Sequence, residues 1–113
     1  MTAPSSGAKW VLLLQRGSED VLSEAAAMTA AASSLGLEVV LVWFDGALEA
    51  LVSGRLDADS DERSAGCLFR QARETGRVRY LACSASMVSS RFGPEKVREK
   101  VDDIVGWPTA IHL

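Results

Sequence analysis

Short apolar runs alternate with longer segments of mixed polarity along the chain. Residues 9–15 (KWVLLLQ) and 37–44 (LEVVLVWF) are apolar almost throughout, which is typical of strands buried on both faces of a parallel sheet. Residues 78–83 (VRYLAC) contain β-branched and aromatic side chains that favour strands, and they follow Gly76, a residue typical of helix ends. The pattern therefore predicts three strands separated by helical segments.

The first connecting segment is predicted to be a long, alanine-rich helix. Ser18 is a suitable N-cap, the helix continues to about Leu35, and Gly36 ends it. Six side chains form its expected inner face: Val21, Leu22, Ala25, Met28, Ala32 and Leu35. Small alanine side chains allow such a helix to approach a sheet or another subunit closely.

The second connection is predicted to contain two helices. Residues 47–52 form a short helix, residues 53–61 an exposed polar loop, and residues 62–75 a helix that Gly76 stops. Apolar side chains on one face of this second helix are spaced for burial: Ala65, Leu68, Phe69 and Ala72.

The C-terminal third is predicted to be mainly helical. A short turn or helix is expected over residues 86–92, and Gly93-Pro94 begins another helix with proline at its favoured first position. Four apolar residues continue this helix at helical spacing until Gly106: Val97, Val101, Ile104 and Val105. Residues 109–113 have two alternatives, a last short strand or an irregular tail.

The alternation of strands and helices predicts an α/β fold, with a mostly parallel sheet of four or five strands covered by helices on both faces. Right-handed crossovers place the carboxyl ends of parallel strands at one edge of the sheet, where ligand and reaction sites lie. We therefore expect the loops at residues 16–18, 44–46 and 83–86 to converge.

Length and composition narrow the classes of function. The 113 residues suit one domain, which we expect to span residues 9–113 after a short disordered lead-in at residues 1–8. A net charge of −3 argues against nucleic acid as a partner. The sequence contains neither an apolar run of about 20 residues nor the features of a signal peptide. We therefore expect a cytoplasmic protein without a membrane partner, whose two cysteines are free thiols.

The sequence lacks the motifs of several common kinds of active site. The sequence contains no glycine-rich dinucleotide or phosphate loop and no C-x-x-C. The first arginine after Cys83 is Arg91, which does not give the C-x5-R spacing of a small cysteine phosphatase. Asp45 is the only acidic residue at a predicted strand end, so a phosphate-receiver site is disfavoured. One histidine, His112, and no clustered ligands give no indication of a metal or other cofactor.

Cys83 is the strongest candidate for chemistry. Ser84 and Ser86 follow it and are both suitable helix N-caps, so the cysteine is expected at a helix N-terminus, which favours an anionic thiolate. Two interpretations remain open from the residues alone: a nucleophile at a strand-to-helix turn, or a buried small hydrophobe. Arg16 is expected either to attract an anionic group to this edge or to be a solvated loop residue.

Other distinctive residues favour structural roles. Cys67 falls on the polar side of the helix over residues 62–75 and is expected to be a surface or interface cysteine. His112 is expected to be structural. The three tryptophans, at positions 10, 43 and 107, are expected in the core or in subunit contacts rather than around a ligand.

Taken in order, four features of the sequence resemble the small DsrE/DsrF-like (YchN-like) proteins, which include sulfur-relay subunits. They are the opening strand with its alanine-rich helix, LGLEVV leading to FDG, TGRV followed by ACSAS, and the later RFG. The resemblance covers about residues 9 to 108. It implies a three-layer α/β/α subunit that assembles into trimers, hexamers or mixed complexes with homologous subunits.

The resemblance also implies a function for the cysteine. In sulfur-transferring members, a cysteine at the position of Cys83 carries persulfide sulfur from a donor protein to an acceptor protein. Arg16, Ser84 and Ser86 are then the expected substrate-binding residues around it. Two alternatives are a non-catalytic oligomeric scaffold or regulatory subunit of the same fold, and a binder of anions or small molecules at the same edge.

Overall fold

The computed structural model describes residues 9–58 and 60–113. The predicted lead-in at residues 1–8 lies outside the described residues.

The centre of the fold is a parallel sheet of four strands in the order β1-β2-β3-β4. The strands are β1 (Lys9–Leu14), β2 (Glu38–Trp43), β3 (Val78–Cys83) and β4 (Asp103–Val105). All three neighbouring pairs are parallel. The predicted α/β class and parallel sheet are therefore confirmed, with four strands in the described part of the chain.

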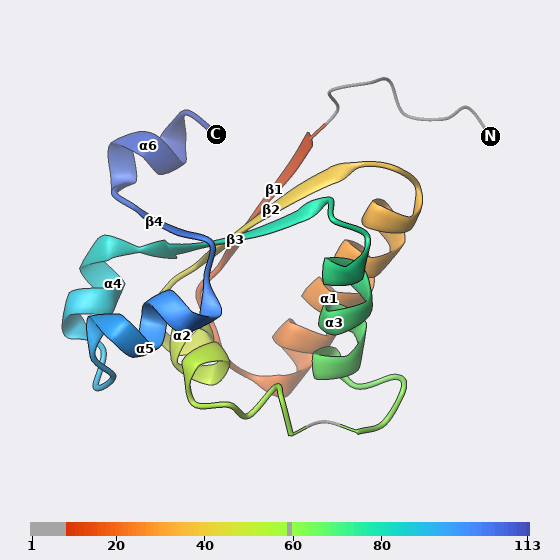
Figure 1. Cartoon of the computed structure of the whole chain (residues 1–113), viewed down its shortest axis with the longest axis horizontal. Helices are drawn as coiled ribbons and strands as arrows, with labels where there is room; N and C mark the ends of the chain where they lie inside the picture. The colour runs from red at the N-terminus through yellow and green to blue at the C-terminus, as the bar shows by residue number, and fades with distance from the viewer. Residues whose placement is uncertain (1–8, 59) are drawn as a thin grey trace.

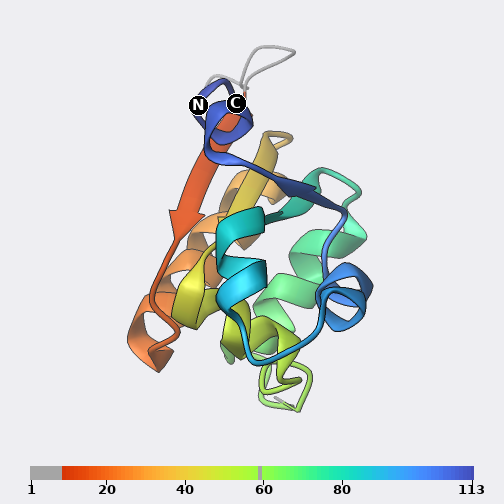
Figure 2. The same cartoon turned by 90° about the vertical axis from the view of Figure 1, so that its left-hand side faces the viewer.

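Helices cover the two faces of the sheet unequally. Among the described residues, the helices between residues 19 and 100 lie on one face, and the last helix lies on the other (Figures 1 and 2). Successive neighbouring strands joined by right-handed crossovers place their helices on the same face, which explains the asymmetry. The helices are α1 (Glu19–Ser34), α2 (Asp45–Val52), α3 (Ala65–Glu74), α4 (Ser84–Ser89), α5 (Pro94–Lys100) and α6 (Trp107–Ile111).

Successive side chains of a strand point to opposite faces of the sheet, so the buried apolar side chains form two clusters. The larger lies between the sheet and the helices of residues 19 to 100. It includes the fully buried Trp43, whose ring lies 5.4 Å from Phe69 and 5.1 Å from Tyr80 between ring centroids. The smaller cluster lies on the other face, beneath α6, and contains Val40, Val42, Phe44, Leu81, Cys83 and Val105.

Helix α1 packs on α3, and its inner face is more polar than the sequence predicts. Thr29 and Ser33 are buried, whereas Met28 and Leu35 are exposed. The two buried hydroxyls donate to carbonyls one turn earlier, Thr29 to Ala25 at 2.7 Å and Ser33 to Thr29 at 2.8 Å. These bonds satisfy the hydroxyls, so short polar side chains can occupy the close interface.

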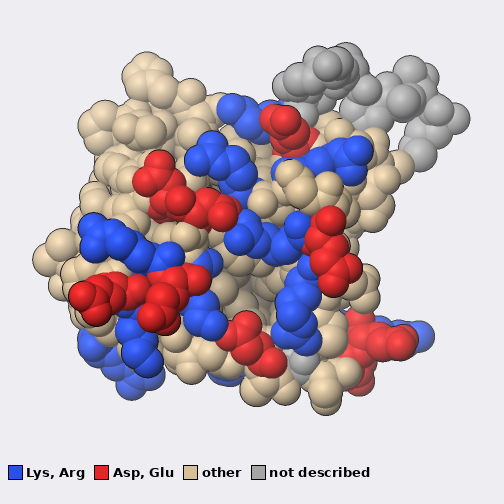
Figure 3. Space-filling model, viewed as in Figure 1, with Lys and Arg blue, Asp and Glu red and all other residues tan. Residues whose placement is uncertain are grey.

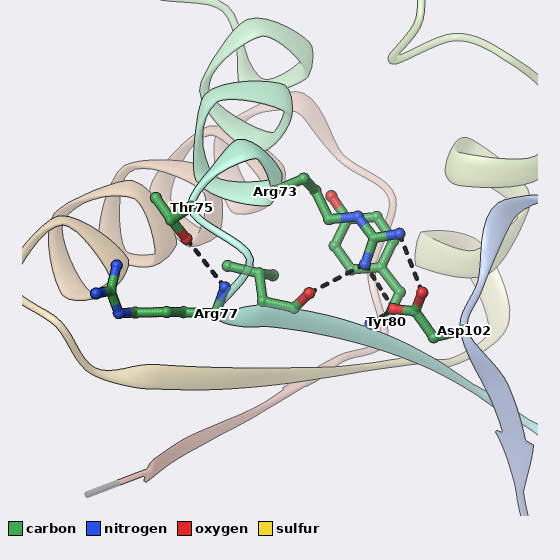
Figure 4. A network of polar contacts seen from close by, with 6 residues as sticks. Arg73, Thr75, Arg77, Tyr80 and Asp102 are labelled. Atoms are coloured by element: carbon green, nitrogen blue, oxygen red, sulfur yellow. Dashed lines mark hydrogen bonds and ion pairs between the residues drawn. The ribbon is translucent and has the colours of Figure 1, made fainter. Parts of the chain in front are cut away.

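The prediction of one long helix from Pro94 to Gly106 is wrong. Helix α5 ends at Lys100, Val101 is extended, and the chain enters the sheet as β4. Asp102 directs this turn, because its N–H donates to the Tyr80 carbonyl and its carboxylate accepts the Tyr80 N–H at 2.7 Å. Arg73 binds the same carboxylate, at 2.5 and 3.2 Å (Figure 4). These contacts stabilise the extended chain after Lys100, although the spacing of the apolar residues would also fit a helix.

Neither alternative for residues 109–113 is correct, because most of the segment belongs to α6. Gly106 precedes this helix and Pro108 lies in its first turn, the position where proline is favoured. The serine-capped start predicted near Cys83 is also displaced: α4 begins at Ser84, and its N-cap is Cys83 itself.

The surface in the view of Figure 3 carries lysine and arginine side chains interspersed with acidic ones. No helix in the described part of the chain is long and apolar enough to cross a bilayer.

We predict that Asp102→Asn lowers the free energy of unfolding by about 1–3 kcal/mol at neutral pH, because it removes the charge from the acceptor of Arg73 and the Tyr80 N–H. Urea unfolding measures this loss. Asp57→Asn is the matched control: it removes a carboxylate that pairs with Lys100 at a more exposed site, and should cost about 0–1 kcal/mol. Equal losses in the two variants would contradict the role assigned to Asp102.

The same interaction predicts a pH dependence. Burial raises the pKa of Asp102, but hydrogen bonds from Arg73 and the Tyr80 N–H outweigh burial and hold the pKa below its ordinary value of 3.8. The lowered pKa stabilises the folded state above pH 3.8, and this stabilisation disappears as the pH falls through the folded-state pKa. The stability difference between the natural chain and Asp102→Asn should therefore shrink in acid, as urea titrations at several pH values would show.

Candidate functional site

The loops after β1 and β2 lie against each other at the carboxyl edge of the sheet. The Phe44 N–H donates to the Leu14 carbonyl at 2.8 Å, and the Ala47 N–H donates to the Gln15 carbonyl at 3.0 Å. A Cβ on Gly17 would lie 2.3 Å from the Gly46 carbonyl oxygen. Such an approach is possible only without a side chain at Gly17. Glycine at this position therefore allows the two loops to lie in contact.

Asp45 lies at the centre of this edge. Its φ of +41° is the only positive value among the described non-glycine residues, a left-handed conformation that aspartate tolerates better than most residues. Its carboxylate accepts hydrogen bonds from Gln15 Nε2 at 3.1 Å and from Ser86 Oγ at 2.9 Å. These bonds, first that of Gln15 and then that of Ser86, lower the pKa of Asp45. The residue is therefore an anchored anion at neutral pH.

Cys83 borders a cavity at the same edge. The cavity has a volume of about 280 Å³ and is lined by Leu13, Gln15, Phe44, Asp45, Cys83, Ala85, Ser86, Ser89 and Trp107. The cysteine is only 3% exposed, and it also belongs to the smaller apolar cluster. Its side chain thus lies between a packed apolar layer and a small, partly polar hollow.

Cys83 lies at a helix N-terminus, as predicted, but no serine caps this helix. The helix that follows, α4, has six residues and no side-chain N-cap hydrogen bond. Ser86 does not cap it, because Ser86 lies inside the helix, where its hydroxyl donates to Asp45. Cys83 therefore lies at the start of a short helix and beside the cavity.

The predicted site residues are only partly brought together. Cys83 and Ser86 line the same cavity, whereas Arg16 and Ser84 are not among its lining residues. Arg16 is exposed and Ser84 is half-buried beside Cys83 in the chain. The convergence of three loops is present, but the first loop contributes Gln15 where the sequence suggested Arg16.

Among the lining residues that the sequence did not single out as site residues are Gln15, Asp45 and Trp107. Asp45 follows β2, which neighbours the strand β3 that ends at Cys83, and this adjacency is the sequence signal for a contact between Asp45 and Ser86. Trp107 stacks on Phe44, with 5.0 Å between ring centroids and 28° between planes. Nothing in the local sequence indicates that α6 crosses to this face.

A second and larger cavity, of about 450 Å³, lies where the start of α1 meets the loop between α2 and α3. Arg55 and Arg63 line it together with Glu19 and Asp61, so its charges balance. Arg55 also donates to the Gly17 carbonyl. This cavity contains no cysteine, and we assign the candidate chemistry to the smaller one at the sheet edge.

The remaining candidates lie elsewhere. Cys67 is half-buried on α3 and accepts a hydrogen bond from Arg70 at 3.0 Å, and His112 is exposed at the end of α6. Among the described residues, no group of three or more His, Cys, Asp and Glu side chains is arranged to hold a metal ion.

Comparison with known proteins identifies the family. The model of the DsrE/DsrF-like family matches residues 9–106, which include all four strands. The chain therefore belongs to the DsrE/DsrF-like family, as its sequence features indicated. A search of curated proteins found no match.

We predict that removing either donor to Asp45 raises its pKa towards the ordinary value of 3.8. Ser86→Ala and Gln15→Ala each remove one hydrogen bond that favours the ionised form. Carbon-13 NMR titration of the Asp45 carboxyl group measures the change. Ser89→Ala is the control, since that hydroxyl bonds only to the carbonyls of Ala85 and Ser86. A pKa of Asp45 unchanged in both test variants would refute the network.

Proposed function

We propose that this protein is a sulfur carrier that holds persulfide sulfur on Cys83 and passes it to a partner protein. Membership of the DsrE/DsrF-like family supports the class of function. The observation that carries the assignment to a residue is the position of Cys83 on a cavity at the carboxyl edge of the sheet, the edge where parallel α/β proteins place their sites.

The proposed reaction is two successive sulfur transfers. The Cys83 thiolate attacks the outer sulfur of a donor persulfide, the donor S–S bond breaks, and the donor leaves as a thiolate. An acceptor thiolate then attacks the outer sulfur of the Cys83 persulfide and regenerates the Cys83 thiolate. No net oxidation occurs, because each step forms one S–S bond and breaks another.

The cavity suits the storage of a labile sulfur atom. Its volume of about 280 Å³ leaves room for one added sulfur and the end of a partner side chain. Phe44 and Trp107 form an apolar wall, and burial of Cys83 to 3% exposure limits contact with bulk water and with large thiols. Ser86, fixed by Asp45, is the predicted polar residue of α4 that lines the same cavity.

A non-catalytic scaffold or regulatory subunit of the same fold is the second candidate. The low exposure of Cys83 and its contacts in the apolar cluster with Val42 and Leu81 favour this alternative. In that case the cysteine acts as a small hydrophobe.

We further propose that the protein acts in the cytoplasm, with donor and acceptor proteins and in an assembly with further copies of itself or homologous subunits. Two large apolar side chains outside the cavity support the assembly, because they lie open on α4 and α6: Val88 and Ile111 are 80% and 75% exposed. Exposed apolar groups of this size are typical of interaction surfaces.

We predict that incubation with a cysteine desulfurase and cysteine adds about 32 Da, the mass of one sulfur atom, to Cys83. Intact mass spectrometry should show the adduct on the natural chain, its reversal by dithiothreitol, and its loss in Cys83→Ser. Cys67→Ser is the matched control and should retain the adduct. An adduct that persists in Cys83→Ser, or no adduct on the natural chain, would favour the scaffold. Native spectra of the same samples give the subunit number, and a monomer would contradict the assembly.

A further inference from the structure

The cavity beside Cys83 has an unbalanced charge. Among its lining residues Asp45 is the only ionisable side chain apart from the cysteine itself, and no described cationic residue lines it. The donors that hold the Asp45 carboxylate are the amide of Gln15 and the hydroxyl of Ser86. Both donors are neutral, so they orient the negative charge without cancelling it. Each carboxylate oxygen has a further lone pair to offer.

The apolar part of the same lining suits a cation as well. The stacked rings of Phe44 and Trp107, 5.0 Å apart, form part of the cavity wall. Trp107 is 53% exposed, so part of its surface is open to an incoming group. Aromatic faces attract ammonium and guanidinium groups, most strongly when desolvated. A carboxylate and an aromatic wall in one cavity therefore recognise the same class of ligand.

We propose that this cavity accepts a cationic group, so that Cys83 exchanges sulfur with donors or acceptors that carry an ammonium or guanidinium close to their reactive sulfur. The cavity disfavours anionic sulfur compounds, because they would approach the fixed Asp45 carboxylate. Its size of about 280 Å³ admits a side chain or a small molecule but not a folded surface. The inference rests on the proposed reactivity of Cys83 and specifies in addition that the sulfur donor or acceptor carries a positive charge.

Thiol–disulfide exchange with small probes tests this selectivity directly. The Cys83 thiolate attacks a symmetrical disulfide, a mixed disulfide forms at Cys83, and one probe thiolate leaves. Three probes of similar size differ in charge: cystamine is cationic, bis(2-hydroxyethyl) disulfide is neutral, and dithiodiglycolate is anionic. A Cys67→Ser background ensures that only Cys83 reacts. Each rate is divided by the rate of the same probe with 2-mercaptoethanol, which removes intrinsic differences between leaving groups.

At low ionic strength we expect the normalised rate with cystamine to exceed that with dithiodiglycolate by about tenfold or more. Added salt should reduce this ratio, and Asp45→Asn should bring it to within about twofold of unity. Asparagine has the shape of aspartate and tolerates the positive φ of this position. Glu74→Gln is the matched control, because it removes one negative charge at an exposed position on α3 that does not line the cavity. The ratio of the two normalised rates in this control should equal the ratio in the Cys67→Ser protein.

The possible failures are distinguishable. A ratio near one in the parent, or a high ratio that Asp45→Asn leaves unchanged, would overturn the charge selectivity while leaving Cys83 a reactive thiol. No reaction of native Cys83 with any probe, when the unfolded chain reacts with all three, would overturn the proposed sulfur transfer and the selectivity with it.

Discussion

The side chains around Cys83 are brought together by a contact between two backbones. Past the ends of β1 and β2, hydrogen bonds from Phe44 to Leu14 and from Ala47 to Gln15 continue the parallel pairing into the loops. Gly17 then lies so close to Gly46 that a Cβ would meet the carbonyl oxygen at 2.3 Å. This contact places the amide of Gln15 beside the carboxylate of Asp45. The neighbouring strand β3 ends in the thiol of Cys83, and the helix α4 that follows supplies Ser86.

The unequal cover of the sheet determines where the thiol can act. Because consecutive strands are neighbours, the crossover helices occupy one face and leave the other to α6 alone. Cys83 points to this sparsely covered face, among Val42 and Leu81, and the loop edge and Trp107 form the cavity beside it. The cysteine is thus shielded from bulk solvent by few elements, which is compatible with controlled access for a small group.

The first three strands, most helices and the family could be predicted from sequence because they depend on local patterns. Buried apolar runs gave β1, β2 and β3, and glycines marked the ends of α1 and α3. The C-terminal region could not be predicted, because Asp102 ends the helix by pairing with Arg73 and Tyr80, residues more than 20 positions away. The apolar spacing from Val97 to Val105 fits a helix equally well.

The candidate site, too, could be predicted only in part from the sequence. Cys83 and the convergence of the loops follow from strand order, but the choice between Gln15 and Arg16 depends on how the chain turns after β1. Ser86 is of a residue type that suits a helix cap, yet it lies inside α4 and donates its hydroxyl proton to the Asp45 carboxylate. Contacts between loops from different strands determine the roles of these residues, and a local sequence pattern does not predict such contacts.

The account depends on Cys83 being reachable from its cavity in the folded protein. Alkylation of the native chain with iodoacetamide, a reagent small enough for a cavity of about 280 Å³, measures this directly when peptide mass mapping follows the labelling of Cys83 with time. The account predicts labelling of native Cys83 that a bulky maleimide does not reproduce. Labelling by either reagent only after the protein is unfolded would show a sealed packing residue and contradict the account.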